Sequence, residues 1–251
     1  MLGLDRIGKR YGRGPWVLRD VDLAVEPGEL VVVAGGNGSG KSTLLRVAAG
    51  LTAPTTGRVR RPASVGYLPE RFPAGVGLSA RAYLGHLAAV RGVPARWDLL
   101  EALGFVGDDS APMARLSKGN AQKVALVQAL QATDLLVLDE PWSGLDAAAG
   151  AVLGELVATA REEGAAVLLT DHHGHDLPDA RELRLTGGSP TGVVVELDRV
   201  GGLLARVSEL DGVLAATAVG GGARLEVRRD ASDGVLAEVL RLGCSVRSVR
   251  S

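Results

Sequence analysis

The stretch AGGNGSGKST, residues 34–43, constrains the fold of this chain more than any other. It fits the pattern Gly-x-x-x-x-Gly-Lys-Ser, with Gly35, Gly40 and Lys41 at the fixed positions. The apolar run ELVVVAG predicts a buried strand before the loop, and STLLRVAAG predicts a helix after it, which Gly50 ends. A strand, a glycine-rich loop and a helix in this order indicate an α/β fold.

The glycine-rich loop suits the binding of a phosphate group. Glycines let backbone N–H groups turn toward an anion without Cβ clashes, and the following helix directs its positive end there. We expect Lys41 to reach the β- and γ-phosphates and Ser42 to bind Mg²⁺. The alternative is a glycine-rich turn with an exposed lysine. The residues expected to hold the nucleotide are Gly35, Gly36, Asn37, Gly38, Ser39, Gly40, Lys41, Ser42 and Thr43.

A second motif, LLVLDE, ends in two carboxylates. Four apolar residues precede Asp139 and Glu140, so both should emerge at the carboxyl end of a buried strand, where open α/β sheets bind ligands. We expect Asp139 to bind Mg²⁺ directly or through water. Glu140 is then placed to take a proton from the water that attacks the γ-phosphate. The alternative is a strand that ends in a charged turn, which the glycine loop makes less attractive.

Composition limits the other possibilities. The chain has 251 residues, 46% of them apolar, and a net charge of −1, so no overall field recruits nucleic acid or anionic lipid. No apolar run approaches the roughly 18 residues of a membrane span, and no signal-peptide core follows Met1, which predicts a cytoplasmic protein. Cys244 is the only cysteine, which excludes an internal disulfide and a cysteine-built metal site.

The chain divides into two predicted domains, residues 1–190 and 191–251. Within the first, residues 71–133 have helical periodicity, and a strand, helix, strand unit of a parallel sheet follows them. After the loop GGSPTG, the runs suggest the order β-α-β-β-α-β, a small α+β module of ferredoxin-like type. In an alternative arrangement, its first strand completes the preceding domain.

Seven motifs in order resemble the nucleotide-binding domain of an ABC transporter ATPase. They are Tyr11, the 35–42 loop, GYLPE, LSKGN, LLVLDEP, SGLD and LLTDHH, and they cover residues 1 to about 190. The resemblance implies a P-loop NTPase fold of ABC type, with an antiparallel β subdomain and a helical insertion at about 71–133. It also implies ATP and Mg²⁺ as ligands, and a head-to-tail dimer with two ATP molecules at its interface. In the family this insertion touches the membrane partner, and the alternative for residues 71–133 is a core-building helical layer with no partner.

The resemblance assigns further residues to the nucleotide. Tyr11 matches the aromatic that stacks on adenine, although a lone tyrosine is more often a packing residue. The signature that contacts the γ-phosphate of the facing subunit is matched by Ser117, Gly119 and Asn120, with Lys118 in place of the usual first glycine and Asn120 in place of a glutamine. Asp146 matches the loop that crosses to the other subunit, and its alternative role is a helix N-cap.

Two more assignments concern Mg²⁺ and the γ-phosphate. Glu70 stands where the family usually has a glutamine that senses Mg²⁺ and the attacking water. His172, 32 residues beyond Glu140, matches the histidine that hydrogen-bonds the γ-phosphate, with His173 as the alternative. His175 is expected to be a solvated loop residue. The His-x-His spacing also suggests a metal site, but no acidic or cysteine cluster completes one.

The resemblance implies an ATP-hydrolysing subunit that powers a separate integral membrane permease. Such a subunit lies in the cytoplasm, peripheral on the inner face of the membrane, as a homodimer or a heterodimer with a related ATPase. The C-terminal module resembles ATPases of efflux systems, so we expect an exporter. The alternatives are a soluble ABC-type ATPase that acts on ribosomes or DNA, and a small-molecule kinase. No nucleic acid partner is expected, because the chain has no basic extension or coiled coil.

Overall fold

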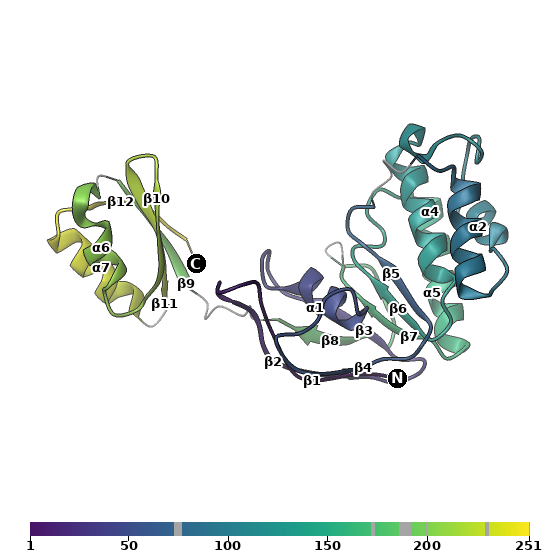
Figure 1. Cartoon of the computed structure of the whole chain (residues 1–251), viewed down its shortest axis with the longest axis horizontal. Coiled ribbons are helices and arrows are strands. Elements are labelled where there is room, and N and C mark those ends of the chain that lie inside the picture. The colour runs from purple at the N-terminus through teal and green to yellow at the C-terminus, as the bar shows by residue number, and fades with distance from the viewer. Residues whose placement is uncertain (73–76, 172–173, 186–191, 199, 229–230, 251) are drawn as a thin grey trace. The chain divides into compact units, whose positions relative to one another are not determined.

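The computed structural model describes the whole chain except residues 73–76, 172–173, 186–191, 199, 229–230 and 251. The chain forms two compact units, Met1–Leu185 and Thr186–Ser251 (Figure 1). None of the described helices is long and apolar enough to cross a membrane. Each unit has its own hydrophobic core, and the two are therefore described separately.

The centre of the first unit is a five-stranded sheet in the order β5-β6-β7-β3-β8. All four neighbouring pairs are parallel. Helices or a second sheet cover both faces, and the central strands β6 and β7 are accordingly unbroken apolar runs with every residue buried. The strands are β3 (Leu30–Ala34), β5 (Val65–Leu68), β6 (Leu135–Leu138), β7 (Ala166–Leu169) and β8 (Arg181–Arg184).

An antiparallel sheet in the order β2-β1-β4 lies on one side, and helix α1 contacts both β1 and β2 of this sheet and β6 of the parallel sheet. One core joins this sheet, α1 and one face of β3, β6 and β7; Leu44 and Leu45 of α1 are fully buried in it. This arrangement is the predicted antiparallel β subdomain. Its elements are β1 (Leu2–Arg10), β2 (Trp16–Val25), α1 (Lys41–Ala48) and β4 (Thr56–Arg60).

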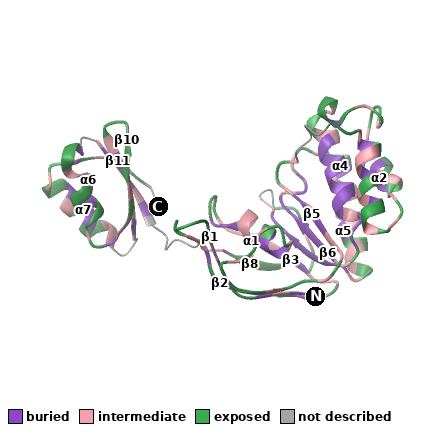
Figure 2. Cartoon of the chain, viewed as in Figure 1, coloured by how far each residue is buried: buried purple, intermediate pink, exposed green. Residues whose placement is uncertain are grey.

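Helices cover the other face of the parallel sheet. Helix α4 packs directly on β5 and β6 and is buried on almost every side, from residue 121 to 129 (Figure 2). The core-building interpretation therefore describes α4, whereas α2 and α3 pack against α4 from outside. The helices are α2 (Ala80–Arg91), α3 (Trp97–Ala102), α4 (Lys118–Leu130) and α5 (Ala147–Glu162), and a short 3-10 turn covers Met113–Arg115.

The second unit has the predicted β-α-β-β-α-β order. Its four strands pair antiparallel in the order β10-β11-β9-β12, which is a split βαβ sandwich. The first strand, β9, belongs to this sheet, so the alternative in which it completes the preceding domain is wrong. Its elements are β9 (Gly192–Asp198), a 3-10 turn (Gly201–Leu203), α6 (Leu204–Ser208), β10 (Val213–Val219), β11 (Gly222–Arg228), α7 (Ser232–Arg241) and β12 (Ser245–Arg250).

Candidate functional site

The glycine-rich loop joins the carboxyl end of β3 to the start of α1, as predicted. Two of its glycines are required by the backbone. Gly35 has φ 152° and a Cβ there would lie 2.6 Å from the Leu185 carbonyl oxygen. Gly40 caps α1 with φ 100°, and a Cβ there would lie 2.9 Å from the Val17 carbonyl oxygen. Only glycine fits both positions, so the loop keeps its bare backbone.

Lys41 folds back over this loop. Its Nζ donates hydrogen bonds to the carbonyl oxygens of Gly35 at 2.8 Å and Gly36 at 3.2 Å. Beneath it, the Ser39 hydroxyl oxygen is buried and has no hydrogen-bond partner within the described part of the chain. A cation, an orphaned hydroxyl and the positive end of α1 thus meet in one place, which fits an anionic group.

A cavity of about 330 Å³ opens beside the loop and brings three separate sequence motifs together. The loop contributes one wall, and Glu70, Asp139 and Glu140 contribute the other. Glu70 follows β5, and the acidic pair follows β6, so both lie at the carboxyl edge of the parallel sheet. The residues that line the cavity are Val17, Asn37, Gly38, Gly40, Lys41, Ser42, Thr43, Glu70, Asp139 and Glu140.

The acidic pair is held by a residue that the sequence analysis missed. Thr170, fully buried after β7, donates a hydrogen bond from Oγ1 to Asp139 Oδ1 at 2.8 Å. Thr170 Oγ1 also accepts a hydrogen bond from the backbone N–H of Glu140 at 2.9 Å. Glu140 has φ 53°, the left-handed region that a residue with a Cβ seldom adopts. The hydroxyl that ends the apolar run AAVLLT was the only available signal for Thr170.

The residues present fit a magnesium ion. Asp139 is 2% exposed, and its Oδ2 is buried with no hydrogen-bond partner among the described residues, as expected for a carboxylate oxygen that awaits a cation. The described residues contain no group of three or more His, Cys, Asp or Glu that could hold a metal alone. Mg²⁺ suits this site, since it usually binds one or two carboxylates and completes its shell with water and substrate phosphates.

The predicted signature residues do not line this cavity. Ser117 is exposed and caps α4, where its Oγ accepts a hydrogen bond from the Asn120 backbone N–H at 3.2 Å. Gly119 is the second residue of the helix, and a Cβ there would lie 3.2 Å from the Gly144 carbonyl oxygen. Within one chain, the signature and the phosphate loop are therefore separate parts of the surface.

Asp146 is the N-cap of α5, the alternative role named above. Its carboxylate accepts a hydrogen bond from the Ala149 backbone N–H at 2.9 Å, and this bond keeps the pKa of Asp146 below its ordinary value. Lys123 Nζ lies 3.7 Å from the same carboxylate. The predicted role of Asp146 across a dimer stays a prediction.

The structure describes Tyr11 and His175, but not the two histidines between them in the LLTDHH motif. Tyr11 is 51% exposed, so it is not a core packing residue, and it does not line the cavity. His172 and His173 lie outside the described residues. His175 is an exposed loop residue, as expected, and its ring also stacks on Trp142 with centroids 4.5 Å apart, while Nδ1 lies 3.0 Å from Asp171 Oδ1.

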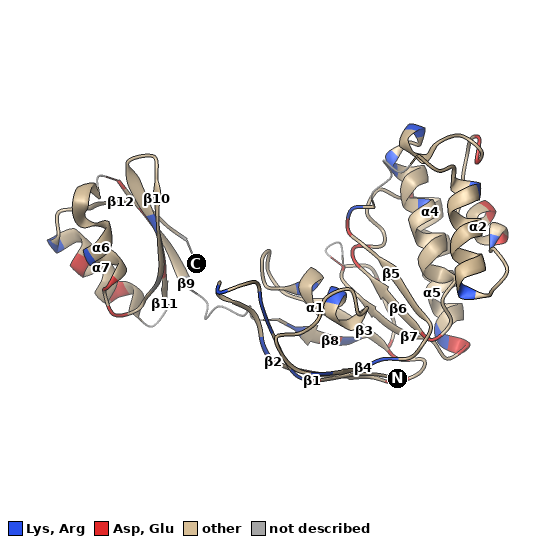
Figure 3. Cartoon of the chain, in the orientation of Figure 1, with Lys and Arg blue, Asp and Glu red and all other residues tan. Residues whose placement is uncertain are grey.

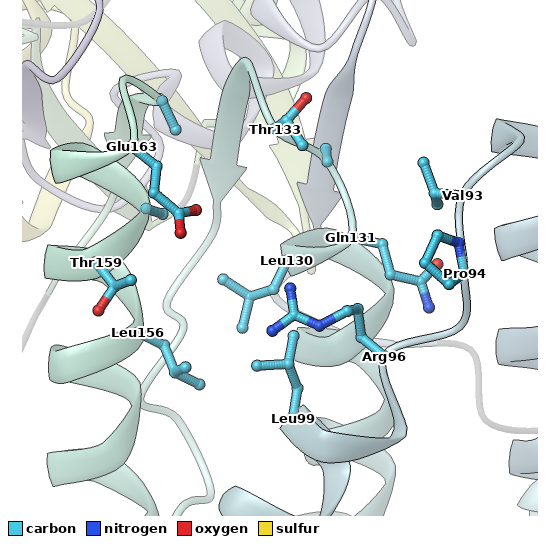
Figure 4. A pocket seen from close by; sticks show the side chains of 13 residues that line it. Val93, Pro94, Arg96, Leu99, Leu130, Gln131, Thr133, Leu156, Thr159 and Glu163 are labelled. Atoms are coloured by element: carbon cyan, nitrogen blue, oxygen red, sulfur yellow. The ribbon is translucent and has the colours of Figure 1, made fainter.

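A second pocket, of about 260 Å³, lies at the opposite, amino edge of the parallel sheet (Figure 4). Its floor is formed by Leu99, Leu130 and Leu156, and the side chains of Arg96 and Glu163 extend over it from different helical segments (Figure 4). This pocket has no glycine loop and no paired carboxylates after a strand. It therefore lacks the chemistry of a phosphate site.

Comparison with known proteins identifies the family of this chain. A family described as "ABC transporter" matches residues 18–143. The zinc import ATP-binding protein ZnuC of Paramagnetospirillum magneticum is 42% identical over 183 residues, which cover 70% of this chain and 69% of that protein. The same protein of Pseudomonas aeruginosa is 40% identical over 182 residues, with 70% and 66% covered. This chain belongs to the ABC transporter ATP-binding family.

Solved structures agree with this assignment. An ATP-binding subunit of an ABC transporter is 29% identical, with a TM-score of 0.60 and 68% of this chain and 79% of that chain covered. A dimeric ATP-binding cassette with bound ADP and phosphate is 24% identical and supports the fold alone, with a TM-score of 0.64 and 74% and 94% covered. The family confirms an ATP-hydrolysing subunit that binds ATP and Mg²⁺. The dimeric state is described for that cassette itself.

The predicted exporter is not supported. Both named relatives are described as zinc import proteins, whereas the export prediction depended on the resemblance of the C-terminal module alone.

Charged residues of both signs are spread over the first unit (Figure 3), in keeping with the net charge of −1.

Proposed function

We propose that this chain is the ATPase subunit of an ABC importer, and that it acts at the inner face of the membrane beneath a separate permease. The observation that carries this proposal is the cavity between the glycine loop and the acidic pair, because it gathers a phosphate cradle, a metal ligand and a base. The names of the relatives support import, and zinc is the cargo to test first. The permease, rather than this chain, would contact that cargo.

The roles of the site residues follow from their places. Lys41 exchanges its loop carbonyls for the β- and γ-phosphates, and the loop N–H groups surround the same oxygens. Ser42, Asp139 and Glu70 would hold Mg²⁺, which neutralises charge on the phosphates when bound. Glu140 accepts the proton of the attacking water, and Thr170 fixes the backbone that presents it.

We further propose that a second copy of the chain completes the nucleotide-binding site. Ser117, Gly119 and Asn120 lie outside the cavity of their own chain, so we assign them to the γ-phosphate of the other. Asp146 keeps its predicted role across the dimer interface. Tyr11 keeps its predicted role on adenine, and His172 keeps its predicted role on the γ-phosphate. Two ATP molecules would close the dimer, and their hydrolysis would reopen it and move the permease between its two access states.

A pair of inactive variants tests the composite site. Lys41→Ala removes the phosphate cation, and Ser117→Arg blocks the signature by bulk, so each homodimer should lose its ATPase activity. A mixture forms heterodimers in which both changes fall in one site and the other site is intact, so part of the activity should return. If heterodimers form and a dimer of wild type with Lys41→Ala is active, a mixture without activity would contradict the head-to-tail arrangement.

The direction of transport is tested in cells that lack this protein. An importer predicts lower total cell zinc, measured by mass spectrometry, and rescue by the wild-type chain but not by Lys41→Ala. Higher zinc in the deletion strain would indicate export. Unchanged zinc, in a strain where the permease is present, would reject zinc as the cargo.

The domain division is also a proposal. All ATP chemistry is assigned to residues 1–190, and residues 191–251 form an accessory module. A chain that ends at Thr191 should bind ATP as tightly as the full chain. Loss of nucleotide binding in a truncated chain with a cooperative unfolding transition would contradict the division.

A further inference from the structure

The sheet of the second unit has two edges with opposite character. Strand β12 is one edge, and its sequence SVRSVR carries arginines; Arg247 forms an ion pair with Asp198 at 2.8 Å. Its pairing with β9 is also irregular between Val246 and Ser248. Charges and irregular pairing are devices that keep an edge strand from joining another strand.

Strand β10 is the other edge and has no such charge protection. Its sequence VLAATAV contains no charged residue and no proline. Ladder pairing with β11 is regular from Ala215 to Val219, and in this segment Ala215, Thr217, Ala218 and Val219 are exposed. The backbone groups on its outer side pair with no other strand in the described part of the chain. The pairing of β10 with β11 shifts register between Val213 and Ala215, but the following segment is uncharged, regular and exposed, and such a segment is a template for strand addition.

We propose that the β10 edges of two copies of this chain pair antiparallel and join their two sheets into one of eight strands. A second copy is the fitting partner, because an uncharged edge meets its own image without like-charge repulsion, and an antiparallel pair is two-fold symmetric. Centring the pair on Thr217 places Ala215 of one copy opposite Val219 of the other. The small side chains on this segment leave room for the approach.

The size of this contact sets when it forms. A five-residue strand pair buries much less than the roughly 1,200 Å² of a stable interface, so it does not hold two free chains together. Dimerisation of the first units raises the local concentration of the second units to the order of millimolar. The β10 pair should therefore form when ATP closes the dimer. This dependence rests on the proposed function.

Single cysteines test the pairing, since the native Cys244 is buried and serves as the background. Thr217→Cys lies at the predicted two-fold axis, and Val249→Cys on β12 is the matched control, since Val249 is also exposed and lies on the opposite edge. Both are placed in full-length chains that also carry Glu140→Gln, which holds the ATP-bound dimer. With ATP and a short bismaleimide, we expect Thr217→Cys to form covalent dimers at least ~10-fold faster than the control, and faster than with ADP.

Light scattering separates the two levels of the proposal. If ATP produces dimers and Thr217→Cys cross-links no faster than Val249→Cys, the β10 pairing is wrong while the proposed ATPase dimer stands. If ATP produces no dimer, the proposed function fails, and the same cross-linking at millimolar chain concentration then decides the β10 pairing alone. Absence of the preference there also overturns it.

Discussion

Among the described residues, both ends of the parallel sheet contain buried polar atoms without hydrogen-bond partners, but only the carboxyl end combines them with a lysine ammonium and a pair of carboxylates. At the carboxyl end, Ser39 Oγ and Asp139 Oδ2 lie beside the Lys41 ammonium and a strained Glu140. At the amino end, Gln131 is 5% exposed, and both of its amide atoms lack partners among the described residues (Figure 4). An unpaired polar atom is destabilising in either place. It supports chemistry at the carboxyl end, because Asp139 lines the same cavity as Lys41 and Glu140.

This difference is tested first at Glu140, where the largest effect is expected. Glu140→Gln keeps the shape of the side chain and removes the base, so ATP binding should be unchanged and kcat should fall at least ~100-fold. Single-turnover hydrolysis and equilibrium ATP binding measure the two effects. Normal turnover would move the base to another residue, such as His172.

Thr170→Val gives the next effect, because it leaves Asp139 Oδ1 and the Glu140 N–H without their shared partner. We expect kcat to fall about 10- to 100-fold through misplacement of the base, with KM for ATP changed less than about threefold. Thr170→Ser is the matched control, since it keeps the hydroxyl and should restore most of kcat. Equal loss in both variants would contradict this role, because the hydroxyl that Thr170→Ser retains would then fail to position the base.

Gln131→Met tests the amino end and should have the smallest effect on activity. The change removes two unpaired polar atoms and nearly keeps the side-chain volume, so the free energy of unfolding should rise by about 1 kcal/mol. ATPase activity should stay within about twofold, because the pocket is at the opposite edge of the sheet. Denaturant unfolding and steady-state kinetics check both parts. A loss of stability would reveal partners for this amide.

The sequence was sufficient for the parts of this molecule that depend on local pattern. The glycine loop, the acidic pair after β6 and the β-α-β-β-α-β order all appear where apolar periodicity and turn residues predicted them. These features need only neighbouring residues, since a strand, a loop and a helix follow one another in the chain. The cavity between the loop and the acidic pair also follows, because parallel strands end at the same edge.

Contacts between distant segments were not predictable in the same way. Thr170 meets Asp139 across 31 positions, and a lone hydroxyl after an apolar run has no periodicity to mark it. The stacking of His175 on Trp142 depends on two loops that come together only in the folded chain. The direction of transport failed for another reason. It was taken from the resemblance of the C-terminal module alone, whereas the named relatives are described as import proteins.

Because the backbone of Glu140 is left-handed, the residue that favours stability at position 140 differs from the residue that favours turnover. Glycine adopts φ 53° without strain, so a Glu140→Gly chain should be relieved of a conformational penalty on the order of 1 kcal/mol while it loses its base. Random mutagenesis screened only for soluble, heat-resistant protein would therefore enrich inactive chains at this position. Any programme to stabilise this ATPase should leave residue 140 unchanged and seek its gains elsewhere.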